Sequence, residues 1–431
     1  MKNLPELRFP EFLDDGEWEE KKLSSIYTFK VTNSFSRDKL NYVSGLVKNI
    51  HYGDIHTKFS TLFDIKKENV PFINSSISLE KIKNDCYCQE SDIVFADASE
   101  DLADVGKSIE IISLNNEKLL SGLHTLLARQ KENKFITGFG GYLFKSNKIR
   151  EQIKKESQGA KVLGISGTRL SNIDISFPLD KCEQQKIADC LTSVDNLITA
   201  QSKKIEALKE HKKGLMQQLF PQDEEEVPKL RFPEFKNAPK WEEKILGKIC
   251  DYWNGGSHEN AVTENGQYYL ISLNSLDIEG NLKTEMKKVN YLDNSLQKND
   301  LVMVLSDVAH GNFLGLAAII PNDNYVLNQR MAGLRKKENE KIIIEFLRIS
   351  INNNQKYFKK HGQGSSQLNL SKGSVTDFPV LVPSTEEEQQ KIAECLSSID
   401  ELITSSSKKV ETLNEHKKGL MQQLFPSKEV K

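Results

Sequence analysis

One long segment of the chain occurs twice. Glu183 to Pro221 and Glu388 to Pro426 are identical at 30 of 39 positions. A shorter tag, LRFPEF, begins at Leu7 and again at Leu230, and Trp-Glu-Glu-Lys follows each copy. The order is therefore globular part, repeated segment, globular part, repeated segment, and the globular parts share little sequence. We expect two modules with a common framework and different surfaces.

Each repeated segment has the pattern of a long amphipathic helix. Its apolar residues alternate at spacings of four and three, a period of about 3.5 residues that is typical of a coiled-coil seam. Asp180 with Glu183, and Thr385 with Glu388, predict capping boxes at the two helix starts. The predicted seam, which serves helix pairing or partner binding, comprises Ile187, Leu191, Val194, Ile198, Ile205, Leu208, Leu215, Leu219, Ile392, Leu396, Ile399, Ile403, Val410, Leu413, Leu420 and Leu424.

The two stripes are expected to pack on each other, because burying one Leu or Ile is worth about 1.5–3 kcal/mol. The alternative is that each helix docks only on its own module. Antiparallel pairing turns a direct repeat into an approximate twofold axis and predicts modules at opposite ends of a rod of roughly 55 Å. Duplex DNA has a similar twofold relation, with half-sites ~34–36 Å or more apart. Gly214 and Gly419, inside the helices, predict either close backbone approach or a tolerated weak spot.

Short apolar runs alternate with helical stretches outside the repeats. This predicts an α+β fold: two mixed α/β domains separated by two long antiparallel coiled-coil helices with pseudo-twofold symmetry. The predicted boundaries are 1–180 and 230–385 for the domains, 181–221 and 386–426 for the helices, 222–229 for an acidic linker and 427–431 for a tail.

Composition excludes several classes of protein. The 431 residues are 38% hydrophobic and 28% charged, as in soluble globular proteins. No apolar run approaches ~18 residues, and the N-terminus lacks the apolar segment of a secretory signal, so we expect a cytoplasmic protein without a membrane partner. Six scattered cysteines are too few for a disulfide framework.

Positive charge is concentrated in two corresponding stretches, although the net charge is only -2. Residues 129–161 and 335–372 each hold nine Lys or Arg against three Asp or Glu. Such stretches suit contact with DNA phosphates, and a solvated helix face is the alternative. Arg side chains suit guanine, and Gln or Asn suit adenine. The DNA-binding candidates are Asn33, Ser36, Arg37, Lys48, Asn49, His51, Tyr52, Lys154, Lys155, Lys161, Thr168 and Arg169 in the first half, and Asn254, Ser257, His258, Lys359, Lys360, Gln363, Ser365, Gln367 and Asn369 in the second.

Motifs of common enzymes are missing from the sequence. There is no phosphate loop, no G-x-G-x-x-G, no H-E-x-x-H, no G-x-S-x-G, and no Asn/Asp-Pro-Pro-aromatic motif of amino-methyltransferases. Asp97, Glu100, Asp101 and Asp104 would suit a nuclease-type metal site, and an acidic loop after a strand is the alternative. We expect neither a catalytic nor a metal site in this chain.

The chain resembles the specificity (S) subunit of type I restriction–modification systems over nearly its whole length. The resemblance lies in the twin EQQKIA…D…LI helices, each after a Pro-bearing strand end, and in KNIHYGDIHTKF and SDIVFADASEDLADVGK. It implies a non-catalytic subunit whose domains each read one half of a bipartite asymmetric DNA site. The helices would set the spacer and dock methyltransferase subunits.

The same resemblance implies the partners: double-stranded DNA, two modification subunits and restriction/translocase subunits. S-adenosylmethionine, ATP and Mg²⁺ would be bound by those partners, with no cofactor in this chain. Two other hypotheses remain from the residues themselves. A protein–protein scaffold without DNA contact would fit the seam and the near-neutral charge, and an isolated hydrolase or nuclease would rest on Asp97 to Asp104.

Overall fold

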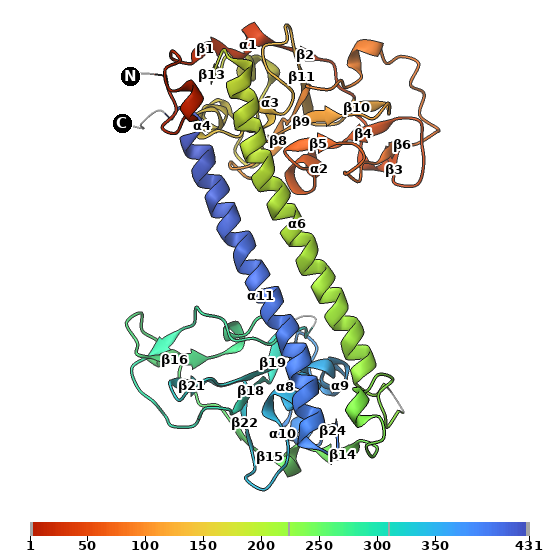
Figure 1. The fold of residues 1–431 in the computed structure, drawn as a ribbon, viewed down its shortest axis with the longest axis vertical. Coiled ribbons are helices and arrows are strands. Elements are labelled where there is room, and N and C mark those ends of the chain that lie inside the picture. Colours follow the sequence, from red (N-terminus) through yellow and green to blue (C-terminus); the bar gives the residue numbers. More distant parts are fainter. Residues whose placement is uncertain (1–2, 223–224, 309–310, 428–431) are drawn as a thin grey trace. The chain divides into compact units, whose positions relative to one another are not determined.

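The computed structural model describes residues 3–222, 225–308 and 311–427 (Figure 1). It divides into two compact units. Module 1 is Met1–Ser202 with Lys408–Lys431, and module 2 is Lys203–Ser407. Both combine short helices with mixed sheets, and two long helices are present, so the predicted fold class is confirmed.

Module 1 is built on a five-stranded sheet in the order β2 (Tyr27–Lys30), β11 (Thr125–Gln130), β7 (Ile93–Ala96), β9 (Ser108–Ser113), β5 (Leu62–Asp64). Neighbours are antiparallel except β5 and β9, which run parallel. The second sheet is β10 (Leu119–Ser121), β4 (Lys48–Ile50), β6 (Phe72–Ile73), β3 (Leu40–Asn41). Two pairs complete it: β1 (Glu19–Lys22) with β13 (Asp174–Phe177), and β8 (Ala98–Ser99) with β12 (Leu163–Gly164).

The helices of module 1 are short. They are α1 (Leu23–Ile26), α2 (Tyr52–Thr57), α3 (Phe139–Leu143), α4 (Asn147–Glu156) and α5 (Gly167–Ser171), with 3₁₀ turns η1 (Pro10–Phe12), η2 (Arg37–Lys39) and η3 (Asn84–Cys86). All four residues of β7 are buried, because this strand lies inside the five-stranded sheet and is covered on both faces.

Module 2 contains an antiparallel sheet in the order β15 (Cys250–Asn254), β22 (Met331–Lys336), β18 (Leu301–Val304), β20 (Ala317–Ile319). A second sheet has the order β17 (Lys288–Val289), β16 (Tyr268–Ile271), β21 (Tyr325–Leu327). Two pairs correspond to those of module 1: β14 (Glu242–Ile245) with β24 (Pro379–Val382), and β19 (Ser306–Val308) with β23 (Gln367–Asn369). The helices are α7 (Leu246–Ile249), α8 (Ile344–Asn353), α9 (Gln355–His361) and α10 (Lys372–Thr376), with η4 (Pro233–Phe235), η5 (Glu259–Ala261) and η6 (Leu273–Ser275).

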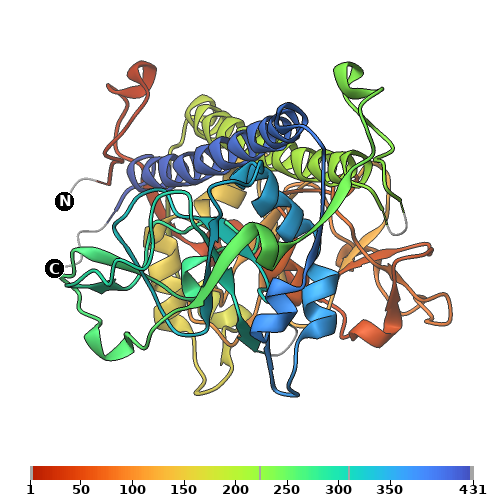
Figure 2. The same cartoon turned by 90° about the horizontal axis from the view of Figure 1, so that it is seen from below.

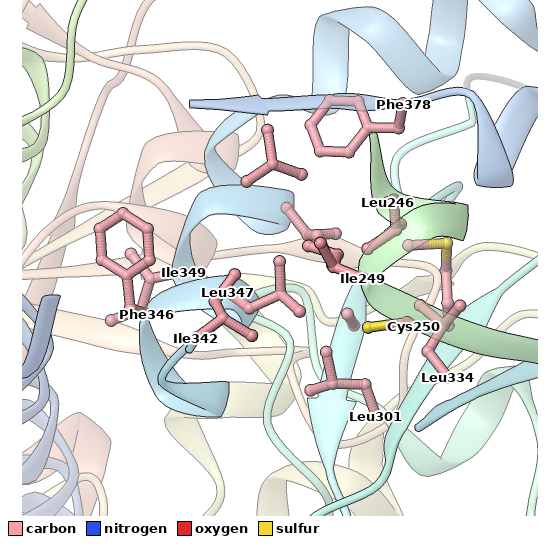
Figure 3. Close-up of a cluster of buried hydrophobic side chains, with 14 of the residues drawn as sticks. Leu246, Ile249, Cys250, Leu301, Leu334, Ile342, Phe346, Leu347, Ile349 and Phe378 are labelled. Atoms are coloured by element: carbon pink, nitrogen blue, oxygen red, sulfur yellow. The ribbon is translucent and has the colours of Figure 1, made fainter. Parts of the chain in front are cut away.

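The core of module 2 forms between α8 and its antiparallel sheet (Figure 3). Phe346, Leu347 and Ile349 of α8 pack in one buried cluster with Leu301 of β18 and Leu334 of β22. Phe346 to Ile351 of α8 are all buried, and the polar side of the helix is hydrogen-bonded: Arg348 binds Glu345, and Asn352 binds the backbone of Ala317.

The two repeated segments form α6 (Lys181–Leu219) and α11 (Glu386–Gln423). The Asp180 carboxylate accepts from the Cys182 N–H at 2.7 Å, and the Thr385 hydroxyl accepts from the Glu388 N–H at 3.4 Å. The reciprocal half of each predicted capping box is missing, because Glu183 and Glu388 bind arginines instead. The predicted N-cap residues are therefore confirmed, whereas the prediction that Glu183 and Glu388 complete capping boxes is wrong.

Within each module, part of one long helix lies antiparallel beside part of the other (Figure 2). In module 1 the buried Leu191 of α6 shares a cluster with Leu424, just beyond α11. In module 2 the buried Leu396 of α11 shares a cluster with Leu219 of α6. The seam residues Ile187, Val194, Ile392 and Ile399 are also buried, whereas Ile198, Ile205, Leu208, Leu215, Ile403, Val410, Leu413 and Leu420 are half-buried.

The LRFPEF tag closes each module onto both helices. Arg8 donates two hydrogen bonds to the buried Glu183 carboxylate, at 2.8 and 2.7 Å, and Arg231 donates two to Glu388, at 2.6 Å each. The Leu7 N–H also binds the carbonyl of Gln423, 2.9 Å away. The repeated tag is thus a structural clamp at the beginning of one helix and the end of the other.

The interior glycines of the long helices have open surroundings. A Cβ built on Gly214 or Gly419 meets nothing within 4 Å among the residues described. Close backbone approach within the chain was therefore the wrong interpretation of these two positions.

Candidate nucleic-acid interface

Two separate segments of module 1, residues 33–37 and 48–52, bring predicted residues together. Asn33 and Arg37 follow β2, Asn49 lies in β4, and His51 and Tyr52 are at the start of α2. The Asn33 amide nitrogen donates to the Asn49 side-chain oxygen at 2.7 Å. The rings of His51 and Tyr52 have centroids 4.7 Å apart. These candidates form one polar group, which we call the 33–52 cluster; in it Arg37 is exposed, whereas Asn49 and His51 are buried.

Some members of the 33–52 cluster have internal, structural contacts. Asn49 is fully buried. Lys48 forms an ion pair with Glu117 at 2.7 Å, and Ser36 donates to the carboxylate of Asp38. A fully buried amide cannot reach a base edge, so we correct the expectation for Asn49 and assign it a positioning role.

The charged core of the cluster is an ion pair between Arg37 and the buried Asp54, 2.7 Å apart. Burial raises the pKa of Asp54, but hydrogen bonds from Arg37 and Lys58 outweigh it and leave that pKa lowered. Burial and the Arg37 charge lower the pKa of His51. The His51 Nδ1 accepts from the Gly53 N–H at 3.2 Å, so the neutral ring carries its proton on Nε2.

The basic stretch of module 1 is only partly available to a phosphate. Lys145 is largely buried, and burial lowers its pKa to about 7. Lys154 pairs with Glu151 at 2.8 Å. Lys155 and Lys161 are exposed and form no ion pair or hydrogen bond within the described residues, which leaves them for phosphate contact.

The predicted guanine reader of module 1 is tied to its own module. Arg169 of α5 donates to the Glu156 carbonyl at 3.0 Å and lies 3.6 Å from the Glu156 carboxylate. Thr168, beside it, is exposed. Because part of the Arg169 fork is already engaged at the end of α4, bidentate reading of guanine by this side chain is not supported by the structure.

In module 2, β15 ends at Asn254, and the turn that follows carries Ser257 and His258. The His258 ring binds the hydroxyl of Tyr291 through Nδ1, and its Nε2 lies 3.4 Å from the Asp293 carboxylate. Asn254 accepts a hydrogen bond from a neighbouring tyrosine hydroxyl, and Ser257 is exposed. These residues border the second sheet of the module.

A hydrogen-bonded amide network joins β19 to β23. Gln367 donates to the Ser306 hydroxyl, which donates to the Asn369 side-chain oxygen at 2.7 Å. Gln363 and Asn369 exchange two backbone hydrogen bonds of 2.9 Å. Ser365 is exposed at the tip of this hairpin. The predicted DNA-binding amides Gln363, Gln367 and Asn369 therefore lie together beside β19, and hydrogen bonds fix their positions.

The lysines at the end of α9 differ in their availability. Lys359 donates to the side chain of Asn312 at 3.1 Å. Lys360 is exposed and makes no ion pair or hydrogen bond within the described part of the chain. Lys360 is thus the better phosphate-contact candidate of the two.

A hollow of about 320 Å³ beside the amide network was missed by the sequence prediction. Gln367, Asn274, Gln329 and Arg330 are among its lining residues. Asn274 lies in η6, and Gln329 and Arg330 form the turn between β21 and β22. The only sequence signal was a polar Asn-Gln-Arg turn between two apolar strands, which resembles many surface turns.

The two modules share a framework where their sequences differ. Arg129 binds Asp92 through two hydrogen bonds in module 1, and Arg335 binds Asp300 in the same way in module 2. These arginines belonged to the basic stretches, and the structure gives them an internal role instead. Gly159 and Gly364 both adopt positive φ, +133° and +119°.

Side chains differ at equivalent places on this framework. Each positive-φ glycine lies against the carbonyl three residues later, which aligns Val162 of module 1 with Gln367 of module 2. Gln158 forms an isolated antiparallel β-bridge with Gly164, and Gln363 forms the equivalent bridge with Asn369. The amide pair of module 2 is therefore replaced in module 1 by an exposed valine and a glycine.

Three of the four acidic residues of the 97–104 loop in module 1 have internal contacts. Asp97 binds His124 at 3.2 Å, and Asp101 accepts a backbone N–H of its own loop at 2.8 Å. Asp104 pairs with Lys107 at 3.4 Å. Across residues 3–222, 225–308 and 311–427, no three or more His, Cys, Asp or Glu side chains are grouped to hold a metal ion. No described helix has the length and apolarity needed to cross a membrane.

Known proteins of similar sequence point to one family. The family model described as "Type I restriction modification DNA specificity domain" matches residues 15–210 and 239–415. The type I restriction enzyme MjaVIII specificity subunit of Methanocaldococcus jannaschii is 28% identical over 339 residues, covering 75% of this chain and 77% of that protein. The putative MjaX specificity subunit of the same organism is 25% identical over 435 residues, covering 96% and 93%.

Solved structures of similar fold agree with these matches. A type I restriction–modification S subunit from M. genitalium superposes with a TM-score of 0.64 and 16% identity, covering 99% of this chain and 100% of that one. A chain from a study of complex assembly and conformational transition of the type I restriction–modification system gives 0.56 and 12%, covering 95% and 98%.

Proposed function

Because the chain belongs to the type I restriction–modification DNA specificity family, we propose that its modules each read one half of a bipartite, asymmetric DNA site. One observation carries this proposal: equivalent positions on a shared framework hold different residues, Val162 and Gly164 in one module against the amides Gln367 and Asn369 in the other. Two modules that present different residues to DNA from equivalent positions would select different bases.

Phosphate contact supplies affinity in this proposal. Lys155 and Lys161 in module 1, and Lys360 in module 2, are exposed lysines without internal partners among the described residues. Each phosphate that they neutralise releases counterions, so binding weakens as salt rises. These lysines position the protein and carry no sequence information.

The chemistry is proposed to belong to partner subunits. Two modification subunits would dock on α6 and α11 and bind S-adenosylmethionine, and restriction/translocase subunits would use ATP and Mg²⁺. The half-buried stretch of the seam around Ile205 and Ile403 offers apolar surface for such docking. The chain itself would act by recognition.

The decisive experiment maps methylated adenines in DNA treated with the complex of this chain and its modification subunits. We expect one bipartite sequence to be methylated and scrambled duplexes to be left unmodified. Equal methylation of both would contradict the proposal.

A matched lysine pair tests phosphate contact. Lys360→Gln should weaken DNA binding about equally for all sequences and reduce the slope of log affinity against log salt by about 1. Lys298→Gln is the control, because Lys298 is also exposed but precedes β18, at the opposite end from Ser306 and the hollow. An unchanged salt slope in Lys360→Gln would remove this lysine from the interface.

The helices are proposed to set the spacer. One added heptad in each long helix keeps the seam in phase and lengthens each helix by about 10 Å, the rise of roughly three base pairs. The spacer in the methylated sequence should grow, with both half-sites unchanged. A change in either half-site would show that recognition and spacing are not separate.

A further inference from the structure

Arg330 has a backbone conformation that is unusual for its side chain. It directly precedes β22 with φ +69°, in the left-handed region that Gly and Asn normally occupy. In the part of the chain that the structure describes, the other non-Gly residues with positive φ are Ser or Asn, except His124, which directly precedes β11 with φ +55°. A long side chain in this region is a feature to explain, since such strained positions concentrate at functional sites.

Arg330 and His124 occupy equivalent positions in the two modules. Each lies five residues before the arginine that binds an aspartate: Arg335 with Asp300 in module 2, and Arg129 with Asp92 in module 1. The backbone conformation is therefore repeated, whereas the side chain is not. This is the pattern expected of a position that carries specificity on a shared framework.

The Arg330 side chain is free. It is exposed and, within the described residues, makes no hydrogen bond or ion pair. Its backbone is fixed, because its carbonyl accepts from the Leu305 N–H at 2.9 Å. The Arg330 guanidinium is therefore held on a fixed backbone, and its N–H donors have no acceptor among the described residues.

Arg330 lines the 320 Å³ hollow of module 2 together with Gln329 and Gln367. Two acidic residues also line it, and both have other partners. Glu259 binds Lys287 and Asn328, at 2.7 and 2.8 Å. Asp307 accepts two backbone N–H groups at 2.8 Å each. Arg330 is thus an unpaired cation among the described lining residues of the hollow, and its guanidinium is available to a ligand from outside the chain.

We propose that Arg330 is a specificity-determining residue of module 2, with its guanidinium donating to the base edge of a guanine in the half-site that this module reads. The inference rests on the proposed DNA-reading function and adds a residue and a base to it. Guanine O6 and N7 present two acceptors that match the arginine fork, and Gln367 stands beside it to contact a neighbouring base.

The main test is Arg330→Gly, because glycine adopts φ +69° without strain and removes only the side chain. The purified complex with modification subunits is incubated with duplexes randomised at both half-sites, and the methylated fraction is sequenced. In the wild type one position of the module 2 half-site should be guanine. In Arg330→Gly the preference there should fall by about ten- to a hundredfold, with the other half-site unchanged.

Two further variants make the result specific. Asn299 is an exposed residue outside the hollow that also has a positive φ, +71°. Asn299→Gly removes the same kind of backbone strain there and should leave both half-sites unchanged. Arg330→Lys keeps the charge but loses the two-pronged donor, and should also lose the guanine preference. Thermal unfolding of Arg330→Gly should occur no lower than that of the wild type.

Two outcomes would overturn the inference: an unchanged half-site in Arg330→Gly, or equal weakening on every sequence, which marks a phosphate contact. Failure of the underlying function would look different, because the wild-type complex itself would then show no sequence preference.

Discussion

Lys212 of α6 and Asp400 of α11 form an ion pair in module 2, with the lysine nitrogen 2.6 and 2.7 Å from the two carboxylate oxygens. The equivalent pair in module 1 is Lys417 with Asp195, 2.5 Å apart. Lys212 and Lys417 are two of the four positions at which the apolar seam is interrupted, and the other two are Gln201 and Ser406. A lysine in an otherwise apolar seam fixes helix register, because only one alignment places it opposite an aspartate.

Reversing one charge of this pair should destabilise module 2. Lys212→Glu places two carboxylates together and should lower the free energy of unfolding by about 1–2 kcal/mol. The double variant Lys212→Glu with Asp400→Lys restores opposite charges and should recover most of the loss. Denaturant unfolding of the three proteins measures the coupling, and equal losses in the single and double variants would contradict it.

Phe425, just beyond α11, should be essential to module 1. Its ring lies 6.1 Å from those of Trp18 and Phe139, and it is 3% exposed. Phe425→Ala should cost about 3–5 kcal/mol by leaving a cavity. Hydrogen exchange should speed up in β1 and α3, whereas Phe220→Ala should act on module 2 instead. Faster exchange in module 2 from Phe425→Ala would be inconsistent with this assignment.

Glu110 should make module 1 less stable as pH rises. Burial raises its pKa to about 7 from an ordinary 4.5, although the N–H groups of Gly138 and Gly141 donate to it at 2.8 and 2.6 Å. The folded state holds the proton more tightly, so its stabilisation is complete below pH 4.5 and is lost as pH rises through 7. The loss should be of order 3 kcal/mol. The difference in unfolding free energy between the wild type and Glu110→Gln should show this slope from pH 5 to 7.

His124 should affect only the half-site of module 1. His124→Gly keeps a backbone at φ +55° without strain and removes the ring that packs against Tyr52, with centroids 5.3 Å apart. Methylation of a randomised duplex library should show a relaxed base preference in one half-site. The half-site altered by Arg330→Gly should stay as in the wild type. A shared half-site for both variants would contradict the equivalence of the two positions.

The long helices could be predicted from the sequence because a seam and its caps are local patterns. The DNA surface could not be predicted equally well, because the availability of a charged side chain depends on residues distant in sequence. Arg129 looked like a phosphate contact until the fold placed Asp92 beside it, 37 positions away. Arg330 was overlooked because its positive φ cannot be read from an Asn-Gln-Arg turn.

The discontinuity of module 1 has a consequence for protein synthesis. Its first 202 residues leave the ribosome before module 2, but the segment that includes Phe425 emerges after module 2. Module 2, one uninterrupted stretch, has all its residues before then. Module 1, whose synthesis begins first, is therefore the last to complete its core. In the nascent chain, Trp18 lacks its ring contact with Phe425 until that residue has been synthesised.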